Sequence, residues 1–267
     1  MFSPTFIALQ REAGIGAEMI GSGVTLLSKA NSFSVGVYSQ AFFNLTIGLE
    51  RTAKLIVLLD YYFKNSHQFF DDNTLKTKYG HDLRKLLAAA KKVSEELVTD
   101  EMFKFPDTKL HEEFISFLSE FAKTTRYYNL NILTNSGGSQ HDPIKTWNSD
   151  IGELILQQYP LKQKSRVPDE LIDMVEDNIL VLGTSEDHSP LNTIRGAAEN
   201  AHRSEHINKY GRLLALQIAR AMAETLSELR MKAYAEKTKD IPDVNDFFRV
   251  YLNDDKFFLN RKTWRPI

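Results

Sequence analysis

Apolar side chains recur at helical spacing over most of this chain, and that periodicity is the feature that most limits its fold. The clearest stretch is residues 35–64, whose apolar stripe consists of Phe42, Leu45, Leu49, Ala53, Ile56 and Tyr61. Comparable stripes predict helices over residues 74–98 and 109–133. No stretch shows the alternation of apolar and polar residues that is typical of a half-buried strand. The periodicity therefore predicts an all-α fold.

Prolines and turn residues divide the rest of the chain into further helices. Asp142-Pro143 has the pattern of a helix cap followed by proline in the first turn. Pro168 and Pro190 stand in the same position before two later apolar stripes. The helices predicted from these signals cover residues 143–159, 169–182, 191–236 and 243–252. We therefore expect a helical bundle of about seven or eight helices.

The N-terminal stripe, residues 6–29, contains four glycines: Gly14, Gly16, Gly21 and Gly23. Glycine costs about 1 kcal/mol inside a helix, so this helix is expected to be interrupted or to pack very closely on a neighbour. The alternative is a loop that cradles phosphate. No strand precedes these glycines and no Gly-Lys-Ser/Thr follows them, which argues against a nucleotide loop.

The amino-acid composition is that of an ordinary globular protein. The chain has 267 residues and no cysteine, which excludes disulfides and thiolate nucleophiles. Its formal charge is 33 − 35 = −2, which excludes an attraction of the whole protein to nucleic acid. No apolar run is long enough to span a membrane and no secretory signal is recognisable, so we expect a cytoplasmic protein without membrane contact. The turn at residues 135–139 suggests a helical bundle in 1–140 and a helical continuation packing on it in 141–267, as two domains or one.

Residues 35–133 contain motifs similar to those of a known helical family. The first is the helix segment Leu49-Glu50-Arg51-Thr52-Ala53-Lys54-Leu55-Ile56. The second is the helix start His81-Asp82-Leu83 with Leu86-Leu87, and the third is the closing string Thr125-Arg126-Tyr127-Tyr128-Asn129. In these positions the chain resembles the HEPN family of helical domains, over about a third of its length.

The HEPN resemblance implies a helical bundle with a HEPN-like core, frequent dimerisation and one of two functions. Some HEPN domains are metal-independent ribonucleases of defence or toxin–antitoxin systems, and others are inactive binding modules. The active ones carry an Arg followed by His after four to six residues. After Arg126 the corresponding positions hold Asn131, Ile132 and Leu133, so the best-matching region lacks this pair.

One pair with the required spacing exists elsewhere, in Arg195 and His202. About one such pair is expected by chance in a chain with this many Arg and His residues. Arg195, Glu199 and His202 would share one face of the predicted helix. There His202 could act as a base and Arg195 could stabilise the charge of the phosphorane. Glu199 could orient the imidazole. The alternative is a solvated helix face with an Arg195–Glu199 ion pair. A metal site at His202 and His206 is a weaker alternative, because the sequence supplies too few ligands.

Two further groups of residues are candidates for binding. Arg126, Tyr127 and Asn129 could line a pocket or stack a base, although tyrosines there could equally pack on the bundle. The tail residues Lys262, Trp264 and Arg265 combine positive charge with an aromatic ring. Such a tail could follow a nucleic-acid strand, or its rings could dock onto the bundle and leave the charges in water.

Together these patterns favour a HEPN-like, non-catalytic binding module for a protein or RNA partner, in a defence or toxin–antitoxin type setting. We expect a homodimer and predict no metal and no cofactor. The alternative is a metal-independent HEPN-type ribonuclease that uses Arg195 and His202.

Overall fold

The computed structural model describes residues 2–137 and 141–264, without the side chains of Asp72, Leu75 and Lys76. The protein is all-α, as predicted: helices dominate the described residues and strand is nearly absent. A single two-residue pair, β1 (Gly183–Thr184) with β2 (Pro190–Leu191), forms a small antiparallel hairpin that the sequence pattern did not predict. Among the described residues, no helix is long and apolar enough to cross a lipid bilayer.

Helices α1 (Pro4–Leu27) and α2 (Val35–Lys64) pack along each other at very short range. A Cβ atom added at Gly48 would lie 2.7 Å from the backbone nitrogen of Ile20, and one at Gly23 would lie 2.8 Å from that of Leu45. The glycines of residues 14–23 all lie inside α1 rather than in a loop. Close packing is therefore the correct interpretation of these glycines, and the nucleotide loop is wrong.

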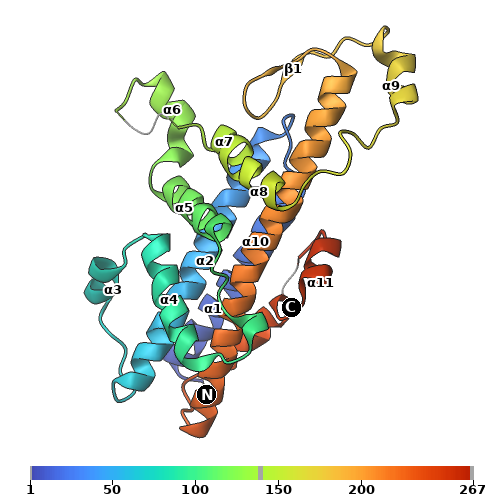
Figure 1. Cartoon of the computed structure of the whole chain (residues 1–267). Helices are drawn as coiled ribbons and strands as arrows, with labels where there is room; N and C mark the ends of the chain where they lie inside the picture. The colour runs from blue at the N-terminus through green and yellow to red at the C-terminus, as the bar shows by residue number, and fades with distance from the viewer. Residues whose placement is uncertain (1, 138–140, 265–267) are drawn as a thin grey trace.

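Helix α10 (Ile194–Ala235) has 42 residues, which corresponds to a length of about 60 Å. Figure 1 shows it running the length of the molecule, in orange. It packs on α1, α2, α4 (Leu83–Leu97) and α5 (Lys109–Lys123). Its middle and C-terminal turns are buried through Leu214, Leu216, Ile218, Met222 and Leu226, so the predicted long helix forms the centre of the core.

Several predicted helices are divided. The stripe at 74–98 forms α3 (Asp72–Lys78) and α4, because Gly80 adopts a positive φ of 53° between them. The stripe at 109–133 forms α5, a 3-10 turn (Thr125–Tyr127) and α6 (Tyr128–Leu133). The segment after Asp142 comprises α7 (Pro143–Thr146), a π-helical turn (Trp147–Ile151) and α8 (Gly152–Gln158), and Asp142 caps α7 as predicted. A separate 3-10 turn, Glu101–Phe103, follows α4.

Trp147 lies at the centre of the upper core. Its ring is fully buried against Phe42, Phe114 and Phe117, at centroid distances of 5.2, 6.1 and 5.5 Å. Its indole nitrogen donates to the side chain of Asn208 on α10, 2.9 Å away. One aromatic side chain thus joins α2, α5 and α10.

The C-terminal segment folds back onto α1. A 3-10 helix (Val244–Tyr251) replaces the predicted α-helix near 243–252, and α11 (Asp255–Asn260) follows it. The Tyr251 hydroxyl donates to the carbonyl of Ala17 at 2.6 Å, and the backbone nitrogen of Trp264 donates to the Thr25 hydroxyl at 2.9 Å. These two bonds therefore hold the C-terminal segment on α1.

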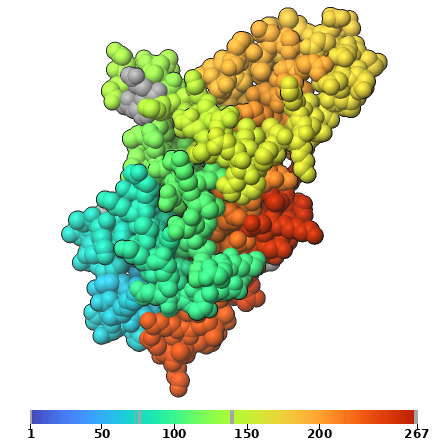
Figure 2. Space-filling model, viewed as in Figure 1, coloured from blue at the N-terminus to red at the C-terminus, as the bar shows by residue number. Residues whose placement is uncertain are grey.

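Two short helices project from the upper end of the molecule. Figures 1 and 2 show α6 on one side and α9 (Asp169–Glu176) on the other. Helix α9 ends at Glu176, so the helix predicted over residues 169–182 is too long by six residues. Between α9 and α10 the chain forms the β1–β2 hairpin.

Candidate functional site

A pocket of about 520 Å³ opens between α1, α2 and the C-terminal end of α5. Seven charged or titratable side chains line it: Glu12, Glu50, Arg51, Lys54, His81, Lys123 and Arg126. Phe43, Ile47 and Phe121 supply apolar wall. The pocket thus contains the side chains of Glu50, Lys54 and His81, which come from two of the sequence motifs noted above. We call it the α2 pocket.

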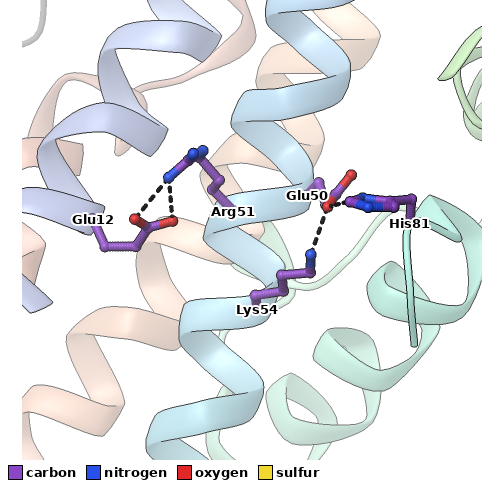
Figure 3. Close-up of polar contacts among 5 residues, drawn as sticks. All are labelled: Glu12, Glu50, Arg51, Lys54 and His81. Carbon is purple, nitrogen blue, oxygen red and sulfur yellow. Dashed lines mark hydrogen bonds and ion pairs between the residues drawn. The ribbon is translucent and has the colours of Figure 1, made fainter. Parts of the chain in front are cut away.

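Glu50 is the central carboxylate of the α2 pocket (Figure 3). It accepts a hydrogen bond from Lys54, one helical turn later, at 2.6 Å. On its other side the Nδ1 atom of His81 lies 3.0 Å from the same oxygen. Only 13% of the Glu50 side chain is exposed, whereas that of His81 is almost free in solvent. Helix α2 therefore holds a half-buried ion pair, with an imidazole at the pocket rim.

Arg51 points to the opposite side of α2 and reaches α1 (Figure 3). Its Nη1 atom lies 2.8 and 2.7 Å from the two carboxylate oxygens of Glu12. Both side chains remain more than a third exposed, so this ion pair contributes little to stability. The other guanidinium nitrogens of Arg51 have no hydrogen-bond partner among the described residues.

Lys123 at the end of α5 also has a carboxylate partner. It lies 2.7 Å from Asp82, the residue that caps α4 through the backbone nitrogen of Lys85. Burial opposes ionisation of this carboxyl, but the hydrogen bonds from Lys123 and Lys85 outweigh it and lower the pKa of Asp82. Asp82 is thus held in its charged form, and Lys123 fixes α5 against α4.

Arg126 is the cation of the α2 pocket that has no carboxylate partner among the described residues. Arg51, Lys54 and Lys123 are each matched by an acid, namely Glu12, Glu50 and Asp82. Four cations against three carboxylates leave an excess of one positive charge, and Arg126 carries it. Its guanidinium lies over the ring of Tyr127, 4.9 Å from the centroid. An exposed arginine without an acid is free to bind an anion.

Arg126 also lines a second pocket, of about 360 Å³, between α6, α7 and the β1–β2 hairpin. Tyr127 and Asn129 line the same pocket, so the structure places the three predicted binding residues of this segment together. The Tyr127 ring is exposed rather than packed on the bundle. Arg126 therefore lies at the junction of two hollows.

The structure does not bring the three predicted catalytic residues into one site. Arg195 and His202 lie two turns apart on α10, about 10 Å along the helix axis. The Arg195 guanidinium is bound to Asp169 and to Asp173, the latter at 2.7 Å, both on α9. Glu199 has no hydrogen bond or ion pair to any described residue. The Arg195–Glu199 ion pair of the alternative interpretation is absent from the described residues, because Arg195 pairs with the two aspartates of α9 instead.

His202 is covered by the segment that joins α8 and α9. Its Nδ1 atom is buried and has no hydrogen-bond partner within the described residues, and the ring contacts the backbone of Gln163. Burial, followed by the charge of Arg166, lowers the pKa of His202. His206 has a different partner: its Nε2 atom lies 2.7 Å from the carbonyl oxygen of Tyr159. Across the described residues no three His, Cys, Asp or Glu side chains form a group that could hold a metal.

The tail residues have different surroundings. Trp264 is only 2% exposed and packs against Tyr251, Phe257 and Phe258, so its ring is not available to stack a base. Lys262 is exposed and lies 3.7 Å from Glu205. Arg265 lies outside the described residues. The docking alternative is thus the correct one for the tryptophan.

Sequence reasoning missed the α2 pocket as a whole, because its acids and bases come from α1, α2, α4 and α5. One local signal was present. Between positions 35 and 59 of an otherwise uncharged helix, the only charged residues are Glu50, Arg51 and Lys54. Three charges confined to one turn of a buried helix indicate a site where that helix meets a pocket.

Comparison with protein-family models, with curated proteins and with solved structures gave no match to this chain.

Proposed function

We propose that this protein is a non-catalytic, HEPN-like binding module that holds a single strand of RNA at the α2 pocket, with Arg126 as the anchor for a phosphate. The observation that carries the proposal is the unmatched charge of Arg126 at the junction of two hollows. Guanidinium groups match phosphate oxygens in geometry and charge, and phosphate contacts supply most of the affinity of non-specific RNA binding.

Aromatic side chains near Arg126 favour a single strand over an isolated phosphate. Tyr127 is exposed beside the guanidinium, and Phe43 is exposed on the wall of the α2 pocket. Proteins that bind single strands combine a positively charged surface with rings on which bases stack, at about 1–3 kcal/mol per base. The α2 pocket offers both kinds of group within one surface.

The residues that support a HEPN-like assignment also meet at this pocket. Glu50, Lys54 and His81 form one hydrogen-bonded group, although they come from two separate motifs of the sequence. The resemblance would place such a module in a defence or toxin–antitoxin type setting. The alternative function, RNA cleavage by Arg195 and His202, gains no support, because Arg195 is neutralised by two aspartates of α9.

RNA binding is tested by fluorescence anisotropy with a labelled single-stranded RNA of mixed sequence in 50 mM salt. We expect a dissociation constant on the order of 10 µM that rises with salt. Arg126→Gln is expected to weaken binding by about tenfold, as loss of one charged hydrogen-bonding group implies. Arg249→Gln is the matched control, because it removes the same charge from an exposed ion pair that does not line the pocket.

Two results would contradict the proposal. One is the absence of salt-dependent binding by the unaltered protein, and the other is an equal effect of Arg126→Gln and Arg249→Gln. The same RNA is also incubated with protein in EDTA and analysed on a gel. Intact RNA agrees with a binding module, whereas cleavage that His202→Ala and Arg195→Ala both abolish would establish the ribonuclease instead.

A further inference from the structure

Positive charge is concentrated on one side of α10, where the segment after α8 and the C-terminal segment meet it. Figure 1 shows both segments on that side, the first in yellow and the second in red. We call the surface formed by residues 160–168, 205–212 and 261–264 the basic face. These three stretches contain seven Lys and Arg residues and a single acid, Glu205. In a chain of formal charge −2, such a local excess is what a polyanion can bind.

Glu205 is the point at which the three stretches of the basic face meet. Arg166 lies 2.8 Å from its carboxylate, and Lys262 lies 3.7 Å from it. The side chains of Arg166 and Lys262 are 59% and 72% exposed, so both remain accessible to a ligand. One carboxylate shared by two cations leaves an excess of positive charge at this point.

Arg212 adds a buried cation beneath the same face. It lies two turns after Glu205 on one side of α10 and is only 4% exposed. Its Nη1 atom donates to the carbonyl oxygen of Arg261 at 3.2 Å, and its Nε atom has no hydrogen-bond partner within the described residues. No described carboxylate forms an ion pair with it. Its charge is screened less than a charge in water, so it strengthens the positive potential above it.

The stretch 160–168 contributes further exposed cations. Lys162 and Lys164 are exposed and form no ion pair with any described residue. The backbone next to them is held on α10, because Nε2 of His206 lies 2.7 Å from the carbonyl oxygen of Tyr159. The two lysines therefore extend from a segment that is anchored beside Arg166.

The basic face offers charge but no exposed aromatic ring. Tyr210 stacks on Tyr159 at a centroid distance of 4.1 Å, and Trp264 is buried. Single strands are held by bases stacked on exposed rings, whereas a duplex stacks its own bases and presents rows of phosphates. Val167 is the only large apolar side chain exposed in the three stretches, which is too little for the apolar centre of a protein interface. These features favour a duplex over a single strand or a protein.

We infer that the basic face binds the phosphate backbone of a nucleic-acid duplex, with Arg166 and Lys262 as phosphate contacts on either side of Glu205. DNA and RNA duplexes share this chemistry, and the experiment below includes both. The inference does not rest on single-strand binding, because no residue of the basic face lines the α2 pocket. Glu205 limits the affinity, since its carboxylate competes with phosphate for the same two cations.

The test measures fluorescence anisotropy with labelled DNA and RNA duplexes of one mixed sequence and with the corresponding single strand, in about 50 mM salt. Each protein also carries Arg126→Gln, which removes the proposed phosphate anchor of the α2 pocket. We expect dissociation constants for the duplexes on the order of 10 µM, rising with salt. The single strand should bind at least several-fold more weakly, because the basic face has no exposed ring on which its bases can stack.

A triple variant tests whether the basic face makes the contact. Neutralising Lys162, Lys164 and Lys262 as Gln should weaken duplex binding by about tenfold or more. It should also reduce the slope of log affinity against log salt by about 2–3, since each lost phosphate contact removes about 0.9. The matched control neutralises as Gln three exposed lysines of α4 and α5, namely Lys85, Lys92 and Lys109. It removes the same charge and should change duplex affinity by less than about twofold.

Glu205→Gln tests the face with the opposite sign. Loss of the carboxylate frees Arg166 and Lys262, so duplex binding should become about threefold to tenfold tighter. Glu113→Gln removes an exposed acid of α5 and should have little effect. A side chain with a purely structural role would not improve binding when it is replaced.

Four results would overturn the inference: no salt-dependent duplex binding, equal losses in the two triple variants, weaker binding by Glu205→Gln, or single-strand binding as tight as duplex binding. A preference between the DNA and RNA duplexes identifies the source of the phosphates. Failure of the unaltered protein to bind the single strand, with duplex binding intact, would contradict only the proposal for the α2 pocket.

Discussion

The body of the molecule and its two projecting segments, residues 127–134 (the α6 arm) and residues 169–182 (the α9 arm), use apolar side chains in opposite ways. Around α10 the large side chains of five helices point inward, and Trp147, Phe42 and Phe114 are completely buried. In the α6 and α9 arms large side chains such as Leu133 and Leu180 are exposed, and α9 is bound to α10 by the ion pairs of Arg195 with Asp169 and Asp173. The body therefore supplies the stability of the fold, while the arms contribute surface.

The largest effect that would test this contrast is expected from Trp147→Ala. Removing a fully buried indole leaves a cavity between α2, α5 and α10, which should lower the free energy of unfolding by about 3–5 kcal/mol. Urea denaturation measures the change. Tyr127→Ala removes an exposed ring and is the control, with an expected cost below about 0.5 kcal/mol. Similar costs for both substitutions would remove the distinction between body and arm.

Helix α2 allows a smaller but sharper comparison, between two of its own glycines. Gly48→Ala would place a methyl group 2.7 Å from the Ile20 backbone nitrogen and should cost about 1–3 kcal/mol, because a backbone cannot move aside cheaply. Gly36→Ala meets no atom within 4 Å and should be neutral or stabilise by up to about 1 kcal/mol. Thermal unfolding of the two variants, run side by side, measures the difference. A tolerated Gly48→Ala would mean that α1 and α2 are not locked at short range.

The smallest effect is expected in the α9 arm itself. Leu180→Ser changes a side chain that is almost free in solvent, so the unfolding free energy of the monomer should change by less than about 0.5 kcal/mol. The measurement is made at a protein concentration low enough to keep the chain monomeric. A loss of more than 1 kcal/mol would show that the arm belongs to the folding unit of the body.

The sequence predicts those parts of the fold that neighbouring residues determine, and it misses those that depend on residues far apart in the chain. Helix α2 matches its predicted bounds, because one continuous stripe runs through it. The apolar stripe predicted one helix across residues 74–98, whereas the motif His81-Asp82-Leu83 indicated a helix start, and the structure separates α3 from α4 at that point, where Gly80 has a positive φ. The aromatic content of the tail correctly indicated that its tryptophan docks onto the bundle. The contact between Tyr251 and Ala17 could not be predicted in this way, because it links residues more than 200 positions apart.

The candidate site follows the same rule. Glu50 and Lys54 stood out only as neighbours one turn apart in a single motif, and no pocket was predicted there. Glu12 and Lys123 were missed, because they reach the α2 pocket from helices that sequence spacing cannot place. The spacing of Arg195 and His202 predicted only that both residues share one helix. A shared helix face says nothing of the two α9 aspartates that bind the arginine.

The contact between the C-terminal segment and α1 has a consequence for the order in which the newly made chain can fold. Helix α1 is synthesised before the groups that bind its Ala17 carbonyl and its Thr25 hydroxyl, because these groups belong to Tyr251 and Trp264. Its partners α2 and α10 also emerge before those residues, so a partly assembled body must persist with one side of α1 uncovered. This side of α1 is therefore covered only after residues 244–264 have been synthesised.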